Sequence, residues 1–271
     1  MSIEANKALL HRLMEAINAG QMAELADHPG FWETRQVIPL AQTMFNDWRT
    51  ISGQQIAEDD LVFTYGAIHA THIGQFAGVA ATSKQVTLEV WSMDQVIDGN
   101  VVQHNSASTW YDVMREVHAA GFDRWPPRVA PLAQPLSMRG TGTSAANKAV
   151  VADLLAALSR GDEHAADRHD GIGALIDEFR ALLSAFPDLQ YTPVVQITEG
   201  DLVGTRATLH GTHTGSLHGF KPTGNTLTFD FYSFDQIANG AIVAHRSTAD
   251  WNAALAQLGI VTSFVDRPNV G

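Results

Sequence analysis

The feature that most constrains this chain is an internal repeat with a constant displacement of 141 residues. Asn6-Lys7-Ala8 returns as Asn147-Lys148-Ala149, and His69-Ala70-Thr71-His72 returns as His210-Gly211-Thr212-His213. Further pairs keep the same displacement: His28/His169, Asp94/Asp235, His104/His245 and Trp110/Trp251. A register that holds without a gap from Asn6 to Trp110 predicts one domain duplicated in tandem.

Each copy is predicted to consist of helices followed by antiparallel strands. In the second copy, an apolar face of helical period ends at Gly161, and a second helix is expected at 173–185. Asn239-Gly240, and Asp98-Gly99 in the first copy, stand where hairpin turns are needed between strand-like runs. The strands expected in the second copy are 191–198, 202–210, 226–234 and 241–249, before a short final helix at 251–258. The predicted fold class is α+β, with helices covering one face of a curved sheet.

Proline and glycine mark the boundary between the copies. The segment 125–144 is rich in Pro, Gly, Thr and Ser without a hydrophobic period, which is typical of a semi-extended linker. We therefore expect a first domain at 1–124, the linker at 125–144, a second domain at 145–262 and a tail at 263–271.

Charge and composition narrow the function classes. With 29 acidic and 17 basic residues, the net charge is −12, which disfavours binding to nucleic acid or to an anionic membrane surface. The absence of cysteine excludes disulfides, a thiol nucleophile and cysteine-based metal sites. The sequence shows no signal peptide and no apolar run of the roughly 20 residues that span a bilayer, so a cytoplasmic location is predicted.

A set of ordered motifs gives the second copy a family resemblance. The motifs are Phe186-Pro187-Asp188-Leu189, Glu199-Gly200-Asp201, Gly211-Thr212-His213-Thr214-Gly215, Pro222-Thr223-Gly224 and Asn239-Gly240-Ala241-Ile242-Val243-Ala244-His245. In this order and spacing they resemble the SnoaL-like polyketide cyclase family, within the nuclear-transport-factor-like superfamily. The resemblance covers nearly all of copy two and, more weakly, copy one. It implies two tandem cone-shaped rolls, each with an apolar pocket sized for a small ring-forming molecule.

The resemblance also implies where the chemistry would lie. In the cyclases, an aspartate two residues after the histidine of the last strand is the acid/base of an intramolecular aldol closure, with a polar partner on the neighbouring strand. These positions hold Ser247 and Ser233 in copy two, and Ser106 and Ser92 in copy one. An unassisted serine hydroxyl does not remove a carbon-bound proton near neutral pH. The resemblance therefore predicts a ligand-binding role for these four serines and chemistry that is altered or absent.

Histidine is the remaining candidate acid/base, because its ordinary pKa of about 6.5 suits proton transfer at neutral pH. We predict His245, His213 and His169 as catalytic residues. Their counterparts His104, His72 and His28 are predicted to bind the ligand. Alternate residues of a strand share a face, so His245 is expected beside Ser247, and His104 beside Ser106. A hydrogen-bonded histidine without chemistry stays open as the alternative, and for His28 and His169 so does a solvated loop.

Three other features lead to narrower expectations. Arg206 is predicted to bind a ligand if it faces the pocket, and to be an ordinary solvated arginine if it does not. His210 and His213 would face opposite sides of a regular strand and have no third ligand nearby, so no metal site is predicted. Asp250 precedes the final helix and is predicted to cap it. No cofactor is expected.

Two functions follow from the sequence. The first is cyclase- or isomerase-type proton transfer on a small, mostly apolar polyketide-like or other carbonyl compound. The alternative is a pair of non-catalytic small-molecule-binding domains, and a protein scaffold is a weaker third. The predicted partners are a small apolar ligand and, within the chain, the other copy, packed as an intramolecular pseudo-dimer. Homo-oligomerisation is left open.

Overall fold

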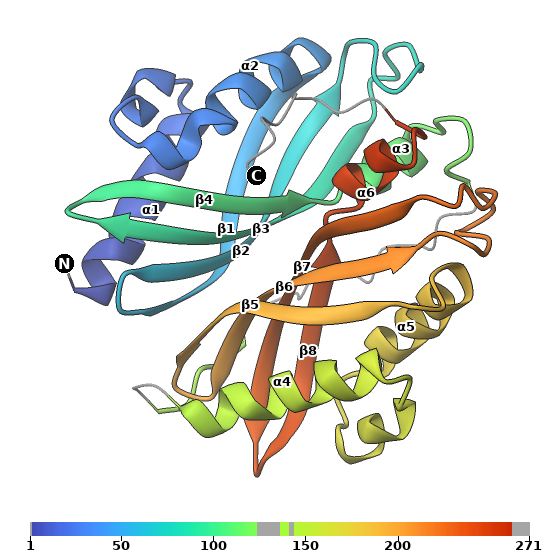
Figure 1. Cartoon of the computed structure of the whole chain (residues 1–271). Coiled ribbons are helices and arrows are strands. Elements are labelled where there is room, and N and C mark those ends of the chain that lie inside the picture. Colours follow the sequence, from blue (N-terminus) through green and yellow to red (C-terminus); the bar gives the residue numbers. More distant parts are fainter. Residues whose placement is uncertain (1, 124–135, 141–143, 262–271) are drawn as a thin grey trace.

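The computed structural model describes residues 2–123, 136–140 and 144–261 of the chain. It contains two four-stranded antiparallel sheets, with strand orders β1-β2-β3-β4 and β5-β6-β7-β8, each accompanied by helices of its own copy (Figure 1). The predicted α+β fold and its duplication are confirmed. The tail and most of the predicted linker lie outside the described residues.

The elements of the two copies follow one another in the same order. Copy one contains α1 (Ile3–Asn18), η1 (Met22–Leu25), η2 (Pro29–Trp32), α2 (Thr34–Met44), β1 (Phe45–Glu58), β2 (Leu61–His72), β3 (Gln85–Ile97), β4 (Asn100–Ser108) and α3 (Trp110–Glu116). Copy two contains α4 (Ala145–Ser159), η3 (Glu163–Arg168), α5 (Gly173–Ala185), β5 (Gln190–Glu199), β6 (Leu202–Thr212), β7 (Thr226–Ala238), β8 (Ala241–Ala249) and α6 (Trp251–Gln257).

The last hairpin of each copy sets the register that the site depends on. Asp98 and Gly99 have φ of 49° and 78°, and Asn239 and Gly240 have φ of 51° and 73°. Positive φ at both turn residues is the type I′ geometry that Asp-Gly and Asn-Gly favour. A β-bulge then follows in each hairpin, between Gln95 and Val96 and between Gln236 and Ile237, and the shifted register places Asp94 opposite His104 and Asp235 opposite His245.

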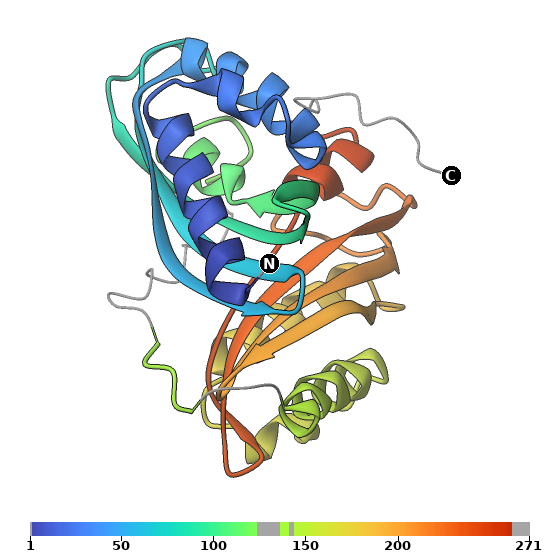
Figure 2. The same cartoon turned by 90° about the vertical axis from the view of Figure 1, so that its left-hand side faces the viewer.

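The two sheets meet through their convex faces. Along β3, Ser92 and Asp94 face the concave side, whereas Trp91 and Met93 belong to a buried cluster with Tyr232 and Phe234 of copy two. At its centre, the rings of Phe63 and Phe234 lie 5.7 Å apart. The alternation of side chains along a strand therefore gives each sheet one face for its own helices and one for the other copy (Figure 2).

Two equivalent ion pairs also join the copies. Glu199 accepts hydrogen bonds from Lys7 Nζ at 2.7 Å and from the backbone N of Ala57 at 2.9 Å. Glu58 accepts from Lys148 Nζ at 2.8 Å and from the backbone N of Thr198 at 2.8 Å. Each residue of one set stands 141 positions from its counterpart in the other. The contacts between the copies thus follow an approximate two-fold symmetry.

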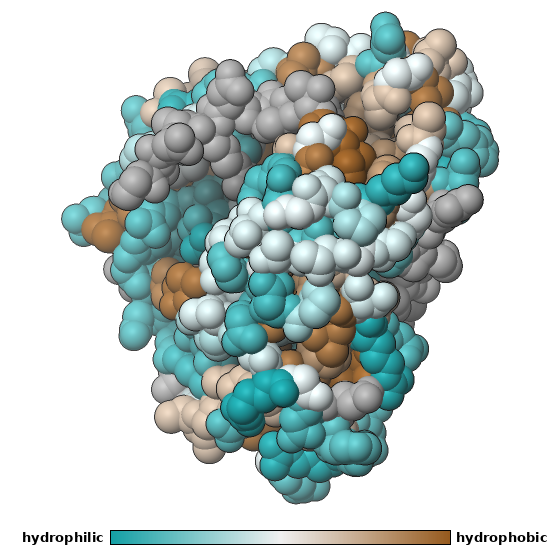
Figure 3. Space-filling model, turned by 45° about the vertical axis from the view of Figure 1, so that its right-hand side comes forward, coloured by the Kyte–Doolittle hydropathy of each residue, from teal (hydrophilic) through white to brown (hydrophobic). Residues whose placement is uncertain are grey.

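The outer surface carries scattered apolar residues. On the face shown in Figure 3, apolar areas form separate patches among hydrophilic ones. Over the whole described surface, the exposed large apolar side chains include Ile51, Ile73, Val194 and Val243. Among the described helices, none is long and apolar enough to cross a membrane.

Candidate functional site

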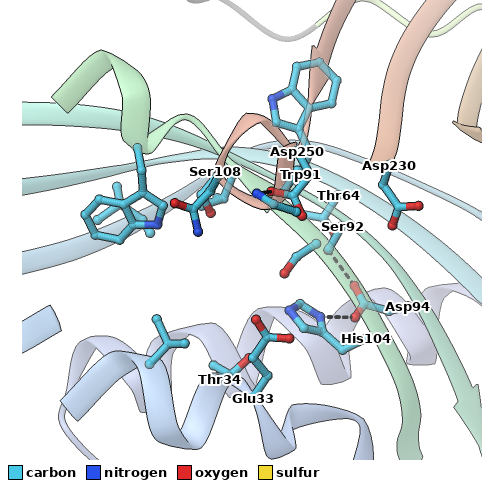
Figure 4. Close-up of a pocket in the computed structure, with 18 of the residues that line it drawn as sticks. Glu33, Thr34, Thr64, Trp91, Ser92, Asp94, His104, Ser108, Asp230 and Asp250 are labelled. Atoms are coloured by element: carbon cyan, nitrogen blue, oxygen red, sulfur yellow. Dashed lines mark hydrogen bonds and ion pairs between the residues drawn. The ribbon is translucent and has the colours of Figure 1, made fainter. Parts of the chain in front are cut away.

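A cavity of about 700 Å³ lies in copy one, between the concave face of the first sheet and the helices α1 and α2. Apolar side chains form much of its wall, including Leu10, Met14, Phe31, Ile38, Ile68 and Val90. Polar side chains lie together on β3 and β4, where Ser92, Asp94 and His104 are joined by hydrogen bonds (Figure 4). The size and the mostly apolar wall are typical of pockets that bind small molecules.

Asp94 fixes the orientation of His104. The carboxylate accepts from His104 Nδ1 at 2.6 Å and from the Ser92 hydroxyl at 2.6 Å, and the Asp94 side chain is buried. A carboxylate can only accept, so Nδ1 carries the proton and Nε2 is left with a free lone pair. An imidazole held in this way can take up a proton at Nε2, and the buried Asp94 carboxylate stabilises the cation that forms.

Copy two repeats this arrangement. Asp235 accepts from His245 Nδ1 at 2.6 Å and from the Ser233 hydroxyl at 2.7 Å. His245 Nε2 lies 2.9 Å from the Ser247 hydroxyl, which is therefore the donor of that bond. The structure thus brings the predicted His245, Ser233 and Ser247 together around Asp235.

The interior of copy two is filled where copy one is hollow. Ile38, Thr50 and Val90 line the cavity of copy one, and their counterparts Phe179, Tyr191 and Phe231 are all buried in the core. The Tyr191 and Phe231 rings meet edge to face at 5.3 Å, and Phe179 lies 6.4 Å from Tyr191. Larger side chains at equivalent positions thus occupy the space that the cavity takes in copy one.

Copy two also holds a carboxyl with an altered pKa. Glu178 of α5 is partly buried, and burial raises its pKa to about 7. Nearby His245 and a hydrogen bond with Trp251 act in the opposite direction. Its counterpart in copy one is Val37, a cavity residue, and Glu33 lines that cavity one helical turn earlier. Copy one therefore has a carboxylate at the N-cap of α2, and copy two has one within α5.

His28 and His169 connect the loop after the first helix to the last strand. His28 Nδ1 accepts from the backbone N of Val101, and His169 Nδ1 accepts from that of Ile242, both at 3.1 Å. Burial is the main cause that lowers the pKa of each. Both histidines are buried, and the contacts in the described residues give them a structural role in holding the loop.

His72 and His213 lie at the end of β2 and just after β6, away from the Asp94 and Asp235 clusters. Their Nδ1 atoms contact Thr82 Oγ1 at 3.0 Å and Thr223 Oγ1 at 3.2 Å. Both side chains are completely buried, and burial lowers their pKa. The structure therefore does not bring His213 together with His245. His169 lies near enough to Asp235 for that carboxylate to oppose the effect of burial on its pKa. A catalytic role for either histidine stays a prediction.

Arg206 lies on the convex face of the second sheet. Its Nε and Nη2 atoms donate to the two carboxylate oxygens of Asp230 at 3.0 and 3.2 Å. Arg206 and Asp230 border the outer part of the copy-one cavity, so Arg206 is near the pocket of the other copy and not its own. The predicted cap is also present, because Asp250 Oδ1 accepts from the backbone N of Ala253.

Sequence reasoning passed over Asp94, Asp235, Glu33 and Glu178. The two aspartates were visible only as repeat markers. A regular hairpin counted back from Asp98-Gly99 places Asp94 opposite Gln103, and only a β-bulge between Gln95 and Val96 brings it opposite His104, so turn chemistry alone would have missed the pair. No local signal identifies Glu178, because its burial depends on how α5 lies on the sheet. Among the described residues, no three His, Asp or Glu side chains converge in a way that could hold a metal ion.

Comparison with known proteins identifies the family. The family model of the SnoaL-like polyketide cyclases matches residues 7–117 and 142–258. The chain belongs to this family and contains two of its domains. No curated protein matches the chain at a significant level.

Solved structures match one copy at a time. AclR from Streptomyces galilaeus is 27% identical, covers 46% of this chain and 91% of its own, and has a TM-score of 0.41. IdmH from Streptomyces antibioticus is 24% identical, and the match covers 42% of this chain and 98% of IdmH with a TM-score of 0.39. A SnoaL-like polyketide cyclase from Agrobacterium tumefaciens is 16% identical, and the match covers 42% of this chain and 98% of that protein with a TM-score of 0.37.

Proposed function

We propose that copy one binds a small, mostly apolar carbonyl compound and that His104 transfers a proton at a carbon next to its carbonyl group. The observation that carries this proposal is the cavity of about 700 Å³ with the Asp94–His104 pair in its wall. Copy two has the same pair as Asp235–His245, but buried aromatic side chains fill its interior. The sequence favoured His245 as the catalytic base, whereas the open cavity beside His104 favours His104 in that role.

The proposed step is an enolisation. His104 Nε2 takes the proton from the carbon, the electron pair of the C–H bond forms a carbon–carbon double bond, and the carbonyl oxygen receives the negative charge. Asp94 stabilises the imidazolium through Nδ1–H. Ser106 lines the cavity two residues after His104, and its hydroxyl is a donor for the oxyanion. This assigns to a histidine the role that the family gives to an aspartate.

Deuterium exchange at C2 of 1-tetralone, followed by NMR in D₂O, tests the step. The wild type is expected to accelerate exchange over buffer, and His104→Gln to lower the acceleration by about a hundredfold or more. His245→Gln is the matched control and is expected to keep the acceleration. Equal exchange in wild type and His104→Gln would exclude His104 as the base. Binding of 1-tetralone without any exchange would favour the second candidate, a non-catalytic binding domain that kept the pocket.

We also propose that the two copies form an intramolecular pseudo-dimer. The shared cluster around Phe63 and Phe234 and the two equivalent ion pairs of Glu58 and Glu199 support this. Such an interface buries sheet surface that a single copy would leave exposed.

A further inference from the structure

The wall of the copy-one cavity contains residues of copy two. The far side of the cavity is formed by α6 and by the convex face of the second sheet. Helix α6 lies beside α3 and reaches β4 of copy one (Figure 1). In the close-up, Asp230 and Asp250 of copy two lie around the same space as His104 and Ser92 of copy one (Figure 4). The cavity is thus bounded by both copies.

Helices α3 and α6 occupy equivalent places in the two copies but carry side chains of different size at three equivalent positions. Helix α3 carries Tyr111, Asp112 and Arg115, with Asp112 fully buried and 3.4 Å from Arg115. At the equivalent positions, α6 carries three smaller residues that line the cavity: Asn252, Ala253 and Ala256. The side chains of α3 are thus larger than those of α6, and the small residues of α6 leave a cavity beside copy one.

One pair of equivalent positions shows which hydrogen bond is missing at the cavity. Tyr111 reaches across to copy two and hydrogen-bonds with Thr248. The counterparts are Asn252 and Ala107, which both line the cavity. Alanine offers no hydroxyl, and Asn252 Oδ1 is buried without a hydrogen-bond partner in the described part of the chain. A polar group of a ligand would restore the hydrogen bond that Tyr111 makes on the other side.

We propose that Asn252 of copy two is a ligand-binding residue of the copy-one pocket, and that α6 sets the length of the compound accepted. The ligand class is an elongated hydroxy-carbonyl compound, with its carbonyl end at His104 and a hydroxyl that donates to Asn252 Oδ1. This inference rests on the proposed function of copy one. The two copies together then form the binding unit, because the small residues of α6 in copy two line the pocket of copy one.

Two probes of different length test the proposal in the full chain. They are 1-tetralone, with two rings, and 2,6-dihydroxyanthraquinone, with three rings and hydroxyls that are free to donate. Binding is followed by quenching of tryptophan fluorescence, since Trp48 and Trp110 line the cavity. Placing the residues of α3 on α6, as Asn252→Tyr with Ala256→Arg, is expected to weaken binding of the three-ring probe by about tenfold or more. The two-ring probe is expected to bind unchanged. Asn252→Ala, a smaller change, is expected to weaken the three-ring probe by about fivefold through one lost hydrogen bond.

Control variants separate the possible failures. Tyr111→Asn, the reverse exchange on α3, is expected to leave both affinities unchanged, and Val90→Phe, which fills the cavity within copy one, is expected to abolish both. If Val90→Phe abolishes binding while both α6 variants bind like wild type, copy one binds alone and this inference is wrong. If the wild type binds neither probe, the proposed function and this inference are both rejected. Thermal unfolding of each variant checks that it is folded.

Discussion

Glu178 should make the stability of this protein depend on pH in a direction opposite to that of most carboxylates. Burial raises its folded-state pKa to about 7, whereas the unfolded value is near 4.5. Below pH 4.5 the group is protonated in both states. Between pH 4.5 and 7 the unfolded chain loses its proton first, so stability falls as pH rises through the folded pKa. The shift corresponds to at most about 3 kcal/mol.

Glu178→Gln removes this ionisation while keeping the size of the side chain. The free energy of unfolding would be measured by urea denaturation with tryptophan fluorescence between pH 4.5 and 8. As pH rises, the free energy of unfolding of Glu178→Gln is expected to increase relative to that of wild type by up to about 3 kcal/mol. Other titrating groups are the same in both proteins, so their effects cancel.

Asp177→Asn is the matched control on the same helix, because the Asp177 side chain is 81% exposed. Its difference from wild type is expected to stay nearly constant with pH. If the difference between Glu178→Gln and wild type is also constant from pH 4.5 to 8, the Glu178 carboxyl is not held in its neutral form and the reasoning from burial is refuted.

Further expectations concern the interface, the buried histidines and the filled interior of copy two. Glu199→Gln should cost about 2 kcal/mol in chemical denaturation, more than Glu58→Gln, since the Glu199 side chain is 8% exposed and that of Glu58 14%. Burial lowers the pKa of His213, so its contribution to stability is present above pH 6.5 and is lost as pH falls through the folded-state pKa. Over that fall in pH, the thermal unfolding midpoint of wild type should drop more than that of His213→Gln. Phe231→Val should lower the free energy of unfolding by about 2 kcal/mol, because it opens a cavity in copy two. Equal unfolding midpoints of variant and wild type would contradict this expectation.

Periodicity and turn chemistry predicted most of the secondary structure. The helix expected at 173–185 is α5, and the strand expected at 241–249 is β8, with the same bounds. The Asp98-Gly99 and Asn239-Gly240 turns were predicted because those dipeptides accept positive φ at both residues. These features depend on neighbours in the sequence, so a sequence pattern contains them.

The candidate site was only partly predictable. The resemblance indicated the positions of His104 and Ser92, and the structure places both in the cavity wall. Asp94 was missed because its importance lies in a hydrogen bond across the hairpin to His104. His213 was grouped with His245 in the prediction, yet it lies beyond the end of β6 against Phe186. Distance between side chains depends on strand register and curvature, which periodicity alone does not fix.

The sequence by itself determined the duplication, the α+β fold of each copy and the family. It showed both copies with the same histidines and the same serines, and so could not tell them apart. Only the tertiary structure decided that copy one is hollow and copy two filled, because that difference is a sum of side-chain volumes, such as Val90 against Phe231, that face the same space only after folding. It also placed residues of α6 in the wall of the cavity of the other copy, an arrangement that depends on how the two folded copies meet.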